Sequence, residues 1–146
     1  MRPALQNVPI FAGLNEDALN LLSDRATEVK SAAGWVVVRE GETGNRLFVV
    51  GQGLVRVCKH FGQPDEIELA KLGPGNFFGE MCILETLARS ATVQAVADTT
   101  LYSLSSLVFY HLYESMPAQH SILVLNIARD ISRRLRHLDE AFAARH

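Results

Sequence analysis

Three polar side chains, Glu80, Arg89 and Ser90, gather in a short and otherwise largely apolar segment of the sequence. Arg89 carries a fixed positive charge and a planar fork of donors that suits phosphate, and Ser90 adds a hydroxyl donor. Glu80 has no cationic neighbour in the sequence, and its carboxylate suits a sugar hydroxyl better than a phosphate. These residue types therefore predict an anion-binding pocket with a hydroxyl acceptor beside it.

The same segment contains the elements that would position these side chains. A glycine-proline turn at 73–75 comes first, an apolar run with helical character follows at 81–87, and a strand-like alternation begins at Thr92. The backbone amides at the N-terminus of a short helix attract an anion. A turn, a helix and a strand so close together are typical of a segment that builds a pocket.

This segment resembles the phosphate-binding cassette of the cyclic nucleotide-binding domain family. That family includes the regulatory subunits of cAMP-dependent protein kinase, the cyclic-nucleotide-gated channels and the bacterial catabolite activator protein. The resemblance rests on two motifs, Phe78-Gly79-Glu80-Met81-Cys82-Ile83-Leu84 and Arg89-Ser90-Ala91-Thr92-Val93. The nine-residue step from Glu80 to Arg89 fits the kinase and channel members. Two positions depart from the usual pattern without removing a side-chain contact: Ala88 stands where proline is frequent, and Cys82 stands at a small-residue position.

The resemblance implies an eight-stranded β-roll flanked by helices, in which the glutamate binds the ribose 2′-hydroxyl of a cyclic nucleotide. It also implies that the arginine and backbone amides bind the cyclic phosphate. Carried over residue by residue, the implied ligand-binding set is Phe78, Gly79, Glu80, Met81, Cys82, Arg89, Ser90, Ala91, Arg134 and Leu138. The ligand is cAMP or cGMP, and no other cofactor is expected. Serine at position 90 favours cAMP as the ligand, because members that prefer cGMP often carry threonine at this position.

Length and composition set the class of protein. The chain has 146 residues, which suits one domain with its own core, here taken as 1–146. Its net charge of −2 argues against nucleic acid as a partner of this chain alone. Cys58 and Cys82 are isolated, which favours buried apolar-like residues over a disulfide or zinc site. No apolar run is long enough for a bilayer or a signal peptide, so we expect a cytoplasmic protein.

The remaining segments divide into helices, strands and helices. Residues 4–26 have a helical apolar pattern, with Asn15 as the expected N-cap. Residues 27–104 alternate short strands with tight turns, which indicates a sandwich or closed roll, and the cassette occupies 78–93. Within this region, Ile67 and Leu69 alternate with acidic residues, as in a half-exposed strand. Residues 105–143 are expected to be helical again.

The last segment predicts one long helix from Ala118 to about Ala143, because Pro117 is tolerated in a first helical turn. This helix has a heptad-like apolar seam and a second apolar line, so we expect it to face both the roll and either the first helix or a partner chain. The residues of the seam are Val124, Ala128, Ile131, Leu135, Leu138 and Phe142. The helix resembles the family's lid, which closes over the base and forms the dimer seam in bacterial members. By that alignment Arg134 reaches the phosphate or Glu80, and Leu138 covers the base.

The combined hypothesis is a stand-alone, non-enzymatic cyclic nucleotide sensor that signals to an unknown downstream partner by closing its lid helix. No nucleophile-base pair or pair of carboxylates stands out in the sequence as a catalytic site. Two alternatives use the same fold. The first is a pseudo-receptor that serves as an interaction or dimerisation scaffold without nucleotide. The second is a metal-dependent cupin-like enzyme, which the spacing of the histidines disfavours.

Overall fold

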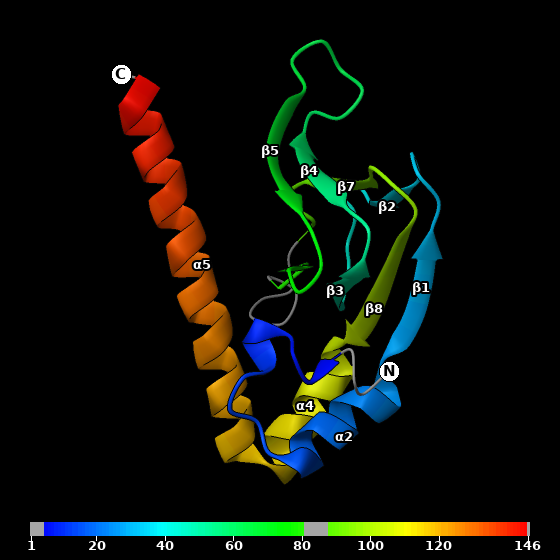
Figure 1. Cartoon of the computed structure of the whole chain (residues 1–146), viewed down its shortest axis with the longest axis vertical. Helices are drawn as coiled ribbons and strands as arrows, with labels where there is room; N and C mark the ends of the chain where they lie inside the picture. The colour runs from blue at the N-terminus through cyan, green and yellow to red at the C-terminus, as the bar shows by residue number, and fades with distance from the viewer. Residues whose placement is uncertain (1–4, 81–87, 146) are drawn as a thin grey trace.

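The structure is a computed structural model that describes residues 5–80 and 88–145. Two four-stranded antiparallel sheets form a β-roll, with a layer of helices at one end and the last helix continuing along one side (Figure 1). The first sheet has the order β1 (Thr27–Ser31), β8 (Thr99–Ser105), β3 (Arg46–Gln52) and β6 (Phe77–Phe78). The second has the order β2 (Val36–Val38), β7 (Thr92–Ala95), β4 (Val55–Lys59) and β5 (Ile67–Leu72). The predicted fold class, mainly β with flanking helices, is confirmed.

The helical layer consists of η1 (Pro9–Phe11), α2 (Glu16–Arg25), α4 (Ser106–Ser115) and the first half of α5 (Pro117–Arg145). Asn15 is the N-cap of α2, as predicted, and its Oδ1 accepts a hydrogen bond from the Ala18 amide at 2.9 Å. The long C-terminal helix begins at Pro117 as the sequence indicated. Because proline needs no amide partner in the first turn, this break between α4 and α5 loses no helical hydrogen bond.

Strand β3 explains how the two halves of the core are joined. Its residues alternate between faces, so that Leu47 and Val49 pack against the helices while Phe48 and Val50 point into the roll. The strand is therefore buried on both faces, which is why it reads as a continuous apolar run. Cys58 is fully buried as predicted, and burial raises the pKa of its thiol.

One local expectation differs from the structure. Ile67 and Leu69 do not alternate between a buried and an exposed face: their exposed fractions are 55% and 44%, and only Leu72 at the end of β5 is buried.

Helix α5 runs from the helical layer along one side of the roll (Figure 1). In its first half Leu123 and Ile127 are buried in the helical core. In its second half Leu135, Leu138 and Phe142 are exposed by 58%, 55% and 66%. The outer half thus presents exposed apolar side chains beside the roll. None of the described helices has the length and apolar character needed to cross a membrane.

Candidate functional site

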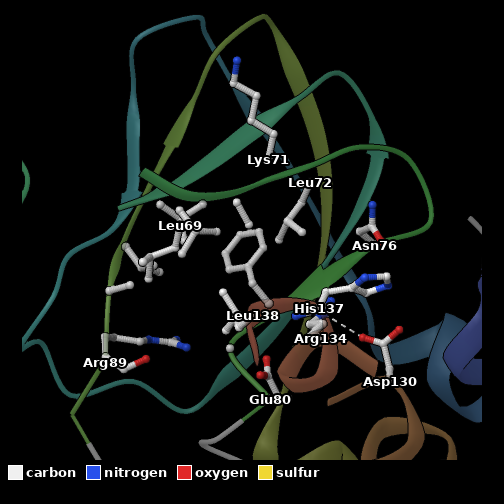
Figure 2. Close-up of a pocket in the computed structure, with 18 of the residues that line it drawn as sticks. Leu69, Lys71, Leu72, Asn76, Glu80, Arg89, Asp130, Arg134, His137 and Leu138 are labelled. Carbon is white, nitrogen blue, oxygen red and sulfur yellow. Dashed lines mark ion pairs between the residues drawn. The ribbon is translucent and has the colours of Figure 1, made fainter. Parts of the chain in front are cut away.

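A cavity of about 660 Å³ lies between the roll and the second half of α5. This volume falls in the range of sites for small organic ligands. The roll contributes both apolar and polar walls to it, and α5 contributes one further wall (Figure 2). The cavity therefore joins residues that are far apart in the sequence.

Eight of the ten sequence-predicted ligand-binding residues line this one cavity. They are Phe78, Gly79, Glu80, Arg89, Ser90, Ala91, Arg134 and Leu138. The other two, Met81 and Cys82, lie outside the described residues. The structure thus brings the cassette and the lid helix together around a common space.

The Arg89 side chain is held by contacts from β3. Its Nη1 donates to the Arg46 carbonyl oxygen at 3.1 Å, and its guanidinium lies 5.9 Å from the centre of the Phe48 ring. Its backbone is also fixed: the Arg89 amide donates to the Glu42 carbonyl at 2.7 Å, and the Arg89 carbonyl accepts from the Gly41 amide at 2.8 Å. These contacts orient the guanidinium while it still lines the cavity.

Two glycines allow this position of Arg89. Gly79 has φ +86°, and a Cβ there would come within 2.6 Å of both Arg89 Nη1 and the Arg46 carbonyl oxygen. A Cβ at Gly44 would overlap the Arg89 guanidinium from another side. The glycine of the Phe-Gly-Glu motif is therefore required both by its backbone conformation and by the close approach of the arginine.

Glu80 and Leu138 line the same cavity from the roll and from α5. Figure 2 shows Glu80 and Arg89 in the lower part of the view with Leu138 near them, and Lys71 at the upper end. Glu80 is half-buried, whereas Leu138 is more than half exposed. A carboxylate, a guanidinium and an apolar cover are thus available to one ligand.

Arg134 connects α5 to the residue before the cassette motif. Its Nη2 donates to the Phe77 carbonyl at 2.9 Å, and its guanidinium lies 4.4 Å from the centre of the Phe77 ring. Its Nε also lies 2.7 Å from Asp130 Oδ2, an ion pair one helical turn away. The contact of Arg134 with a phosphate or with Glu80 stays a prediction.

Several residues of the cavity were not identified from the sequence. On α5, Asp130, His137 and Ala141 line it together with Arg134 and Leu138. Their spacing of three and four residues places them on one helix face, and this periodicity could have revealed them. On the roll, the cavity also contains Leu69, Lys71 and Asn76. These residues carry no comparable local signal, because only the pairing of the strands places them beside the cassette.

The cavity combines a cationic donor, a carboxylate acceptor and an apolar wall around one space of small-molecule size. Within the described residues, no group of three or more His, Cys, Asp or Glu side chains is placed to hold a metal ion.

Comparison with known proteins specifies the class further. The cyclic nucleotide-binding domain matches residues 28–116, more than half of the sequence, so the chain belongs to the cyclic nucleotide-binding domain family. It is 32% identical over 135 residues to the cyclic AMP receptor protein of Thermus thermophilus, covering 92% of this chain and 61% of the relative. It is 30% identical over 132 residues to a cGMP-dependent protein kinase of Caenorhabditis briggsae, covering 90% of this chain and 17% of the kinase.

A solved structure shows the same arrangement. The crystal structure of Thermus thermophilus catabolite activator protein has a TM-score of 0.77 and 33% identity, over 93% of this chain and 62% of that one. This chain thus spans less than two thirds of the length of these three relatives. The family is one of regulatory cyclic nucleotide-binding domains, and its model matches the segment that the chain shares with these relatives.

Proposed function

We propose that this protein binds a cyclic nucleotide, cAMP or cGMP, and acts as a regulatory domain rather than as a catalyst. The observation that carries the proposal is the convergence of Glu80 and Arg89 in one cavity of ligand size, with α5 as its outer wall. A cyclic nucleotide carries an anion, a sugar hydroxyl and a flat base. The cavity offers a complementary group for each of them.

The phosphate is placed against the Arg89 guanidinium and the Ser90 hydroxyl, and the ribose 2′-hydroxyl against the Glu80 carboxylate. Charge-assisted hydrogen bonds of this kind are stronger than neutral ones. The base then lies toward Leu138 and Leu69, the exposed apolar residues of the cavity. Contact with a leucine does not by itself distinguish adenine from guanine.

The choice between cAMP and cGMP rests on Ser90. The relatives include a protein named for cyclic AMP and a kinase named for cGMP, at similar identity. Serine at position 90 favours cAMP. Because the relatives include proteins named for each nucleotide, both nucleotides are tested.

The proposed signal is a change in the position of α5. A ligand that contacts both the cassette and Leu138 binds more tightly when α5 lies closer to the roll. The ligand can shift the equilibrium between the open and closed positions of α5 only by that difference in affinity. The downstream partner then recognises the closed arrangement. A cytoplasmic location and the existence of a downstream partner stay predictions.

The test is calorimetric titration of cAMP and then cGMP into protein from which bound nucleotide has been removed. Micromolar or tighter binding supports the receptor. The Arg89→Ala variant is expected to lose about 3 kcal/mol of binding free energy, roughly a 150-fold weaker Kd, because charge-assisted bonds to the phosphate are lost. The control is Arg129→Ala, an exposed arginine of α5 that does not line the cavity.

Folded, ligand-free protein that binds neither nucleotide would refute the proposal. It would then favour the alternative, in which the roll serves as an interaction or dimerisation scaffold without nucleotide. An Arg89→Ala variant with unchanged affinity would refute the assignment of the cassette even if the nucleotide binds elsewhere.

A homodimer through α5 is the second part of the proposal. It is supported by the exposure of Leu135, which belongs to the heptad-like seam. Light scattering after size exclusion should give twice the monomer mass, and Leu135→Lys should shift the protein to monomer. The exposed, non-seam change Arg136→Lys should not alter the mass. A wild-type monomer at all concentrations would contradict the seam.

A further inference from the structure

A second cavity, of about 270 Å³, opens between the edge strands of the two sheets, β1 and β2. Figure 1 shows β1 on the side of the roll away from α5. The cavity is separate from the one that contains Glu80, and the proposed function does not use it. Two of its wall residues are buried hydroxyls, Ser31 and Ser103, with exposed fractions of 5% and 1%.

Arg46 supplies the charge of this cavity. Its Nη1 donates to the Ser103 Oγ at 3.0 Å. The ion pairs found among the described residues do not include Arg46. A guanidinium has five N–H donors, so most of this donor fork is available to a ligand. Beside the two hydroxyls, it forms a cationic wall that suits a carboxylate.

The rest of the cavity is apolar. Val29, Val37 and the Phe48 ring form its walls, and the Trp35 indole, with an exposed fraction of 67%, belongs to the same lining. A cavity of about 150 Å³ holds benzene, and drug-sized ligands need about 300 Å³ or more. The volume therefore fits one aromatic ring with a small acidic substituent, which an exposed indole can stack upon.

We propose that this second cavity binds a small aromatic carboxylate and that its occupant alters the affinity of the first cavity. The carboxylate pairs with Arg46 and the hydroxyl of Ser103. The ring lies among Val29, Phe48 and Trp35.

The coupling runs through residues that contact both cavities. The Arg46 carbonyl accepts the hydrogen bond from Arg89 Nη1, while the Arg46 side chain lines the second cavity. Phe48 also lines the second cavity, and its ring stacks on Phe78 of the first, with ring centres 5.0 Å apart and planes at 14°. A ligand that displaces the Phe48 ring therefore changes the support of Arg89, whose guanidinium lies beside that ring. This coupling rests on the proposed function, whereas occupancy of the second cavity does not.

The occupancy test uses the indole N–H resonance of Trp35, the sole tryptophan of the chain. Benzoate is titrated into the 15N-labelled full chain, with benzyl alcohol as the uncharged control. For so small a ligand we expect a saturating shift with a Kd on the order of 1 mM. Arg46→Gln should weaken benzoate binding about tenfold or more, whereas Lys30→Gln, on an exposed neighbouring position of β1, should not.

The coupling test repeats the calorimetric cAMP titration in saturating benzoate. The Kd for cAMP should change by about fivefold or more, in either direction. An unchanged Kd for cAMP overturns the coupling. If Trp35 does not respond to benzoate, or responds equally to benzyl alcohol, the anion site itself is overturned. Benzoate binding by protein that binds no cyclic nucleotide would refute the proposed function and leave the second site standing.

Discussion

Contacts with neighbouring residues fix the position of the Arg89 guanidinium, which stands at the end of a flexible side chain. The Arg46 carbonyl accepts from it, the Phe48 ring lies beside it, and Gly44 and Gly79 leave the space that it occupies. Because these contacts fix the guanidinium, less side-chain entropy is lost when a phosphate binds. The presence of glycine at position 79 therefore decides whether the Arg89 charge can face a ligand.

Gly79→Ala tests this dependence. The change imposes a positive φ on alanine and also brings a Cβ against Arg89 and the Arg46 carbonyl. Gly34→Ala is the matched control, since Gly34 has φ +87° and no atom within 4 Å of the added Cβ. We expect Gly34→Ala to cost about 1 kcal/mol of unfolding free energy, and Gly79→Ala about 2–4 kcal/mol.

Urea denaturation measures the stability of both variants, and calorimetry measures their affinity for cAMP. Only Gly79→Ala should weaken nucleotide binding. Equal losses of stability and unchanged binding in both variants would show that Arg89 does not need the space at position 79.

Among the elements, α5 carries the proposed signal, and its attachment is uneven. Near its start, Asn126 Nδ2 donates to the carbonyl oxygens of Ile10 and Ala12 at 2.9 and 2.8 Å, which joins the helix to η1. Farther along, Arg134 donates to the Phe77 carbonyl. From Leu135 to Ala144 the side chains are exposed. The first half of α5 is therefore the half that is attached to the helical core, and the outer half is the part that the proposed signal moves.

Asn126→Ala should destabilise the protein by about 1–3 kcal/mol, because two backbone carbonyls lose their partner. Ser132→Ala, at an exposed position of the same helix, should change stability by less than about 0.5 kcal/mol. Urea denaturation of both variants provides the comparison. Similar values for the two would mean that the Asn126 bonds do not hold α5 in place.

For the whole molecule, the titrating groups predict loss of stability in acid. Burial lowers the pKa of His120, which lies in edge contact with the Tyr113 ring at 5.3 Å. A hydrogen bond from the Gly62 amide, together with Arg56, lowers the pKa of Glu66. In both cases the unfolded chain binds protons more readily than the folded one, so stability falls as the pH falls.

His120→Gln isolates the histidine contribution. In the wild type, the stability due to neutral His120 is fully present above the unfolded pKa and is lost as the pH falls through the lower folded pKa. We therefore expect the variant to lose less stability than the wild type between about pH 7 and pH 5. Thermal unfolding across this range measures the difference. His111→Gln, on an exposed position of α4, should keep the wild-type slope, and an unchanged slope in His120→Gln would contradict the prediction.

Local sequence patterns determined many of the structural elements of this protein and its cassette. The cap at Asn15, the start of α5 at Pro117 and the alternation of the short strands depend on interactions between near neighbours, so they could be read directly. The cassette was also recognisable, because its glycine, acid and arginine must follow one another at set distances along the chain. These features were enough to predict the β-roll and part of the lining of the first cavity, and the roll is confirmed.

Only the tertiary structure decided how distant residues meet. The exposure of Ile67 and Leu69 follows from how β5 lies in the roll, and the link from Arg134 to Phe77 follows from the path of α5. The second cavity arises where β1 and β2 approach each other, and neither strand signals it alone. The physical reason is the same in each case: burial, ion pairing and cavity shape depend on contacts between segments, and one sequence pattern is compatible with several such packings.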